Sequence, residues 1–241
     1  MSRIIALLLL SLSFLCFPTH AKEKKFLTGK APHASAYEGL LPAGMTVAPA
    51  TGFHPSQLQG KRVALVPSAN LNEWARVWSR VYEEGGFESH WSSRLIYRDH
   101  EKNRDRHRGY ENNTDPRNFT EQVIQALQPH VGEIFVAEDL PHARDAGADY
   151  YLILDGWFGL YNTVWNSWFH THGGVYLLDE ALRQAFSVHG EAKEKYETPS
   201  LMKSWSPNAY AEIMDRQSEK ITREMTDKVI SDMQRQLIRS H

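Results

Sequence analysis

The chain has little cysteine, no excess of positive charge and only one long apolar run. Its single cysteine, Cys16, cannot form an intrachain disulfide or a site of several thiolates. With 27 Lys and Arg against 29 Asp and Glu, the formal net charge is −2. This balance lacks the basic footprint of a nucleic-acid-binding protein. The composition therefore favours a globular protein with no nucleic acid partner.

The apolar run predicts a cleavable signal peptide over residues 1–21. Arg3 supplies a positive amino-terminal region, and Ile4 to Phe17 is almost entirely apolar. The run ends at Pro18, short of the roughly 20 apolar residues of a membrane span, which argues against an uncleaved anchor. Small residues at Thr19 and Ala21 suit a signal-peptidase site. We therefore expect an exported protein that functions in the periplasm.

Cys16 lies inside this predicted signal peptide. The neighbouring Leu15 and Ser13 do not match the small and aliphatic residues that precede a lipid-attachment cysteine, so we expect no lipid anchor. The mature chain would then contain no thiol nucleophile and no disulfide. A secreted domain without disulfides favours a bacterial periplasm over a eukaryotic secretory pathway.

The remaining sequence predicts a lead-in segment over residues 22–60 and a single α/β domain over 61–241. A mixed sheet packed with helices and a long C-terminal helix fits the alternation of apolar strands and amphipathic helices. Residues 98–118 read as a solvated polar loop. The expected strands span 62–66, 87–97, 134–137 and 150–154, with a hairpin of 175–178 and 183–192. The expected helices span 70–84, 118–127, the turn 142–147 and 207–239.

Three short motifs carry a resemblance to known proteins. They are the strand Arg62 to Pro67, the sequence Gly85-Gly86-Phe87, and the sequence Ala146 to Leu154. In this order they resemble bacterial envelope proteins with an anticodon-binding-like α/β domain, among them the TolB amino-terminal domain and the curli secretion channel subunit. The resemblance implies an accessory or assembly role without catalysis. Two departures are the missing lipid-attachment box and a longer, more aromatic segment over 156–174.

His170 and His172 form the sharpest local feature. In a strand, residues two apart face the same side, so both imidazoles could bind one metal ion. His189 and Asp179 could complete such a site if the hairpin folds back on it. However, the chain has twelve histidines, so close pairs also arise by chance. We expect no metal and no other cofactor, and keep His170, His172 and His189 as weak metal candidates.

No catalytic motif is present. The chain lacks a Gly-x-Ser-x-Gly nucleophile elbow. A glycosidase-like pair of carboxylates could be drawn from several positions, but their separation is not visible in a sequence. We read both Asp155-Gly156 and Gly173-Gly174 as turns. The carboxylates in question are Glu138, Asp139, Asp155, Asp179 and Glu180.

Aromatic residues gather in residues 156–174, which we read as an insertion following a strand at the sheet edge. Core packing, a docking surface and stacking on sugar rings are all open for this cluster. We favour docking, because polar residues are interspersed among the rings. The cluster comprises Trp157, Phe158, Tyr161, Trp165, Trp168 and Phe169, and all but Phe158 are the predicted binding residues.

These observations predict an exported periplasmic accessory or assembly protein that acts through protein contacts and is not an enzyme. The expected partner is another envelope protein. Contact with the membrane surface and the oligomeric state are left open. The alternative is a periplasmic hydrolase, dependent on a metal or on carboxylates, that acts on envelope polymers.

Overall fold

A computed structural model describes residues 25–26, 32, 35–42, 44–82, 114–162, 167–195 and 207–238. The predicted signal peptide, the expected strand at 87–97, most of the polar loop and Trp165 therefore lie outside the described residues. So does the cleavage site, and export stays a prediction. No described helix is both long and apolar enough to cross a membrane.

A mixed β-sheet forms the centre of the fold, as predicted. Its strand order is β3-β2-β4-β5-β6, and the short β1 pairs with the far end of β4. β2 runs parallel to both β3 and β4, whereas β4, β5 and β6 form an antiparallel meander. The strands are β1 (Lys25–Phe26), β2 (Arg62–Pro67), β3 (Glu133–Val136), β4 (Tyr150–Asn162), β5 (Ser167–Asp179) and β6 (Gln184–Lys195).

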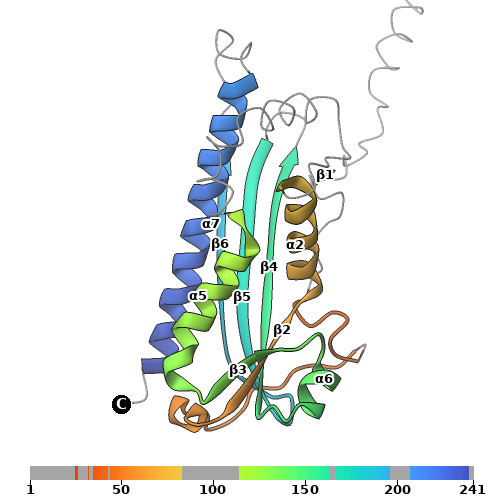
Figure 1. Ribbon diagram of the computed structural model, residues 1–241, viewed down its shortest axis with the longest axis vertical. Helices are drawn as coiled ribbons and strands as arrows, with labels where there is room; N and C mark the ends of the chain where they lie inside the picture. Colours follow the sequence, from red (N-terminus) through yellow and green to blue (C-terminus); the bar gives the residue numbers. More distant parts are fainter. Residues whose placement is uncertain are drawn as a thin grey trace, which may run out of the picture.

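Three helices cover one face of this sheet (Figure 1). α2 packs on β4, α7 packs along β5 and β6, and α5 lies against both helices. The expected helix at 118–127 begins earlier, because Pro116 is its first residue and the Asp115 side chain accepts a hydrogen bond from the Arg117 backbone. The helices are α2 (Ala69–Tyr82), α5 (Pro116–Leu127), α6 (Leu140–Asp145) and α7 (Pro207–Ile238), with short 3-10 turns at Pro55–Leu58 and Gln128–His130.

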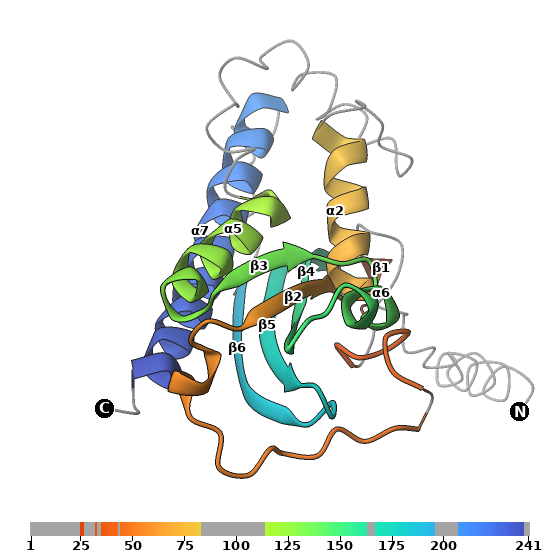
Figure 2. The ribbon, with the colours of Figure 1, turned by 60° about the horizontal axis from the view of Figure 1, so that its bottom comes forward.

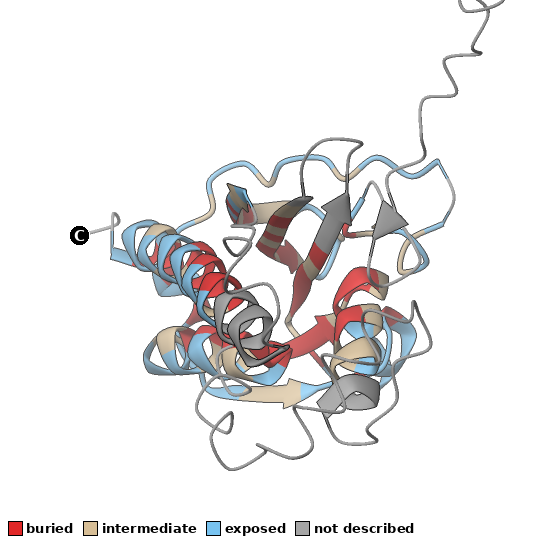
Figure 3. Cartoon of the chain, turned by 90° about the horizontal axis from the view of Figure 1, so that it is seen from above, coloured by how far each residue is buried: buried red, intermediate tan, exposed pale blue. Residues whose placement is uncertain are grey.

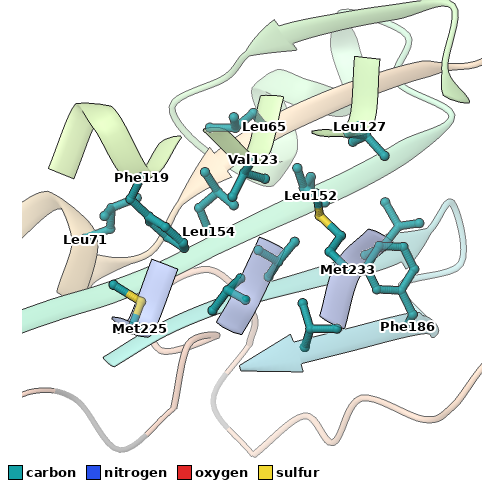
Figure 4. Packing of buried hydrophobic residues seen from close by; sticks show 14 of the residues in the cluster. Leu65, Leu71, Phe119, Val123, Leu127, Leu152, Leu154, Phe186, Met225 and Met233 are labelled. Atoms are coloured by element: carbon teal, nitrogen blue, oxygen red, sulfur yellow. The ribbon is translucent and has the colours of Figure 1, made fainter. Parts of the chain in front are cut away.

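The larger core fills the space between these helices and the sheet (Figure 4). β4 contributes Leu152 and Leu154, α5 contributes Val123 and Leu127, and the edge strand β6 contributes Phe186. The terminal helix supplies a continuous stripe, because its apolar residues recur at helical spacing. The buried stripe of α7 consists of Ile221, Met225, Val229, Met233 and Leu237.

The opposite face of the sheet is covered by α6 and by the lead-in segment. In Figure 2 this segment runs below the sheet, and in Figure 3 it lies on the side away from α7. Ala36 and Leu140 pack there against Tyr151 and Ile153 in a second, smaller core. The Tyr37 hydroxyl donates a 2.8 Å hydrogen bond to Gln184 Oε1, which ties the lead-in to β6.

The aromatic segment 156–174 is not an insertion. Its two halves are the paired arms of β4 and β5, which stay in continuous antiparallel register from Tyr150↔Asp179 to Asn162↔Ser167. β4 lies in the middle of the sheet and not at its edge. The predicted turns at Asp155-Gly156 and Gly173-Gly174 are therefore wrong, because both pairs lie within these strands.

Close packing against α7 explains why two positions in β5 and β6, Gly173 and Gly190, are glycine. A Cβ on Gly173 would overlap the Met225 sulfur, and one on Gly190 would lie 2.6 Å from the Met225 carbonyl oxygen. α7 thus approaches β5 and β6 more closely than a side chain would allow. The glycines mark the places where the helix sits on the sheet.

Candidate functional site

Past the end of β2, the arms of β4 and β5 extend beyond the parallel part of the sheet. Strand alternation places Asp155 and Trp157 of β4 on the face opposite α7, and it places His170 and His172 of β5 on the same face. Trp157 is directly opposite His172 in the register. The prediction that the two histidines share one side of a strand is confirmed.

Asp155 is the buried centre of this region. Its Oδ1 accepts hydrogen bonds from Ser68 Oγ at 2.6 Å and from Asn70 Nδ2 at 3.0 Å. Its Oδ2 lies 3.5 Å from His172 Nε2. Asp155, Ser68 and Asn70 are each less than 5% exposed. A buried carboxylate is tolerated when several donors satisfy it, and this one has three.

The positions of Ser68 and Asn70 follow from the sequence of the β2–α2 junction. β2 ends at Pro67, and the Ser68 hydroxyl accepts a 3.1 Å hydrogen bond from the Leu71 backbone nitrogen. Ser68 therefore caps the N-terminus of α2. The same hydroxyl donates to Asp155, so one residue joins the strand, the helix start and the neighbouring strand β4.

The hydrogen bonds determine the charge state of Asp155. Burial acts to raise the pKa of its carboxyl, but the interactions with His172, Ser68 and Asn70 outweigh burial and lower the pKa below its usual value. Asp155 is consequently ionised at neutral pH. Nearby, burial raises the pKa of Tyr176, and the charge of Asp155 raises it further.

His172 and His170 differ in their surroundings. The His172 ring stacks on Trp157 with centroids 6.4 Å apart, while the His170 ring meets the edge of Trp157 at 4.5 Å. His170 also forms an ion pair with Glu191 of β6. Burial lowers the pKa of His170 below its usual value of 6.5, and the Glu191 carboxylate offsets only part of this shift.

Trp168 continues this surface toward the far end of β5. The ammonium of Lys193 lies 5.1 Å from its ring centroid, a cation–π distance. Both tryptophans are half-buried, as are both imidazoles, whose side chains are 19% and 22% exposed. We call Trp157, Trp168, His170 and His172 together the His/Trp surface.

The structure separates the aromatic residues predicted to bind a partner. Trp157 and Trp168 lie on the His/Trp surface, whereas Phe169 is 1% exposed and packs in the larger core beside Phe158. For Phe169 the core alternative therefore applies. Only the backbone of Tyr161 is described, in register with Trp168.

The four residues considered for a metal site do not come together. Asp179 is at the opposite end of β5, where it pairs with Arg183, and His189 is exposed on β6. Within the described ranges, no group of three or more His, Cys, Asp or Glu side chains is arranged to hold a metal ion.

The carboxylates proposed for a hydrolase are also dispersed. Asp155 is the only buried member of the five. Asp139 caps α6 by accepting a hydrogen bond from the His142 backbone, and Asp179 pairs with Arg183. Glu138 and Glu180 are exposed. Asp155 is thus left with an imidazole neighbour and without a second carboxylate from this set.

Ser68 does not complete a nucleophile–His–Asp relay. In such a relay the imidazole lies between the nucleophile and the carboxylate. Here the Ser68 hydroxyl donates directly to Asp155 and accepts from the Leu71 backbone. The arrangement satisfies the buried carboxylate of Asp155 with hydrogen bonds and orients the His172 imidazole, and the Ser68 hydroxyl has no imidazole between it and the carboxylate.

Sequence reasoning missed Ser68, it did not connect Asn70 with Asp155, and it treated Asp155 as a turn residue. One available signal was the position of Ser68, directly after an apolar strand and before an amphipathic helix, which is typical of a helix cap. No signal in the sequence pairs this cap with a residue in another strand.

Comparisons with known proteins do not identify a family. No family model matches the chain, and no curated protein matches it. Among solved structures, the lipoprotein GNA1162 from Neisseria meningitidis is 13% identical with a TM-score of 0.25. The match covers 65% of this chain and 96% of that chain. This TM-score is too low to establish a shared fold, and the resemblance to TolB-like domains stays a prediction.

Proposed function

We propose that this protein is a non-catalytic accessory protein of the bacterial cell envelope that binds a protein partner through the His/Trp surface. One observation carries the proposal. Three groups surround the buried carboxylate of Asp155, and one of them is the His172 imidazole. This contact holds His172 beside Trp157 on the antiparallel hairpin of β4 and β5.

The energetics favour binding as the purpose of this arrangement. Burying Asp155 has a desolvation cost that an apolar residue at the same place would avoid. The gain is a partly exposed imidazole with a fixed orientation, next to a large aromatic ring. Rigid tryptophans supply contact area with little loss of side-chain entropy, and such residues dominate binding energy at protein interfaces.

The export predicted from the sequence supports the envelope location. The predicted signal peptide over 1–21 and the predicted lack of cysteine in the mature chain both favour the periplasm. A hydrolase remains the competing class, with the Asp155–His172 pair as a general base acting on water. The described residues place no metal cluster and no activated serine beside this pair.

The test compares three forms of the mature protein in crosslinking from intact cells: wild type, Trp157→Ala with Trp168→Ala, and the control Val136→Ala. Val136 is an exposed apolar residue on β3, away from the surface. We expect the control to retain the crosslinked partner and the double variant to lose it, with both melting within a few degrees of wild type.

Two results would contradict the proposal. Retention of the same partner by the folded double variant would place the interface elsewhere. Hydrolysis of cell-wall or polysaccharide material by the wild type, abolished in Asp155→Asn or His172→Gln, would establish the enzyme alternative.

A further inference from the structure

β6 is an edge strand whose outer side is open over most of its length. From Ala185 to Ala192 its backbone pairs only with β5 in the described part of the chain. Unpaired strand edges can accept another extended segment, because their N–H and C=O groups remain available.

The first residue of this edge, Gln184, is already hydrogen-bonded to the lead-in segment of the same chain. The Gln184 backbone nitrogen donates to the Ala48 carbonyl and the Gln184 carbonyl accepts from Ala50, each at 2.8 Å. This contact is a parallel bridge between Pro49 and Gln184. Beyond it the lead-in turns at Thr51 and Gly52, which leaves the rest of the edge unoccupied by described residues.

α7 forms a wall along this edge. A Cβ on Gly190 would lie 2.9 Å from Val229 Cγ2 and 3.5 Å from Lys228 Cβ, so the helix crosses directly over β6. Between them lies a groove of about 370 Å³. Its lining residues are Ser187, Val188, His189, Lys228, Asp232, Arg235 and Gln236.

The position of α7 along this edge argues against a second copy of this chain as the partner that pairs with β6. Adjacent strands lie about 4.8 Å apart, whereas packed helices need about 8–10 Å between their axes. Two copies joined edge to edge through β6 would bring two α7 helices too close together. A single extended segment without a helix of its own meets no such obstacle.

The charged residues that line the groove indicate which kind of extended segment would bind there. Asp232 forms an ion pair with Arg235, which neutralises both. Lys228 is exposed and has no ion-pair partner among the described residues, so it leaves one positive charge in the groove. The groove is therefore complementary to an acidic segment.

We propose that the groove between β6 and α7 binds an extended acidic segment of a partner protein as an added β-strand. Backbone hydrogen bonds to β6 would supply affinity, and Lys228 would supply the preference for acidic side chains. This site is separate from the His/Trp surface, since it lies at the strand edge beneath α7.

The probe is a displayed library of random, unstructured peptides, panned against the full mature protein. We expect the selected peptides to be rich in Asp and Glu. Bound peptide should slow amide hydrogen exchange within residues 185–192, and methylation of alternate peptide nitrogens should abolish binding. Lys228→Glu should weaken binding by about tenfold or more.

The matched control is Arg223→Glu, which changes the same charge on an exposed position of α7 that pairs with Glu219. This variant should bind like wild type, as should the Trp157→Ala, Trp168→Ala form, which separates this proposal from the proposed function. Failure to select any peptide would overturn the inference, as would protection outside β6 or undiminished binding of the methylated peptide. The edge would then simply be shielded by α7.

Discussion

Ser68 Oγ donates a 2.6 Å hydrogen bond to Oδ1 of Asp155, a residue 87 positions further along the chain. This contact links the start of α2 to the middle of β4. It also holds the carboxylate that faces His172. The stability of the fold and the geometry of the candidate site therefore depend on the same few atoms.

Ser68→Ala should destabilise the protein by about 1–2 kcal/mol, since it removes the α2 cap and one donor to a buried carboxylate. Urea unfolding of the purified mature protein measures this loss. Ser56→Ala, at an exposed position, should change stability by less than about 0.5 kcal/mol. Equal effects of the two variants would show that the Ser68–Asp155 contact contributes nothing.

Asp155 should make stability depend on pH in the acid range. Its folded pKa is lower than the usual 3.8, so the unfolded chain binds the proton more tightly. The stabilisation is complete above that unfolded pKa and is lost as the pH falls through the folded pKa. Asp155→Asn should flatten this part of the stability curve, and urea unfolding of the two proteins at several acid pH values measures the difference.

His170 should also make the stability of the protein depend on pH, in a higher pH range than Asp155 does. Its folded pKa is below 6.5, so protonation favours the unfolded chain. Stability should decrease as the pH falls below about 6.5, and it should decrease less in His170→Gln. Thermal melts at several pH values compare the two proteins. Parallel pH curves would mean that burial and the charge of Lys193 do not lower the pKa of His170 beyond what Glu191 restores.

Gly190→Ala should destabilise the protein by about 1–3 kcal/mol, because the new methyl group meets the α7 backbone at 2.6 Å. Gly173→Ala should cost less, since its close contact is with the flexible Met225 side chain, which can move. Denaturant unfolding ranks the two variants. The reverse order would mean that α7 is not seated on β6 as described.

Met225→Ala should cost about 2–5 kcal/mol, because Met225 is fully buried in the stripe of α7. Deleting residues 207–241 removes the whole stripe and should prevent folding, since a domain's total stability is only about 5–15 kcal/mol. Met45→Ala is the control, as Met45 is 44% exposed. Cooperative melting of the truncated chain at the wild-type temperature would contradict this account.

Much of the fold could be predicted because its signals are local. The apolar run at Val63 to Val66 is buried on both faces and became β2, and the spacing of Trp74 and Trp78 identified α2. The stripe from Ile221 to Leu237 likewise indicated the terminal helix. In each case the periodicity of apolar residues matches the surface that the element buries.

The long hairpin could not be read this way, because its glycines are typical of turns. Gly156 and Gly173 lack side chains since Trp74 of α2 and Met225 of α7 pack against them. That requirement comes from helices distant in the sequence, so no local pattern shows it. The same limit applies to Asp155, whose strand position depends on pairing with β5 and whose partners come from the β2–α2 junction.

The most direct test of the proposed function is site-specific crosslinking from single cysteines in intact cells, with Cys16 changed to Ser in every form. Lys195→Cys places a thiol opposite Trp168 in the β5–β6 register, and Arg223→Cys places one on exposed α7. We predict a discrete adduct with one envelope protein from position 195 and none from position 223. An adduct from position 223 alone, or none from position 195 while the partner is still captured, would contradict binding through the His/Trp surface.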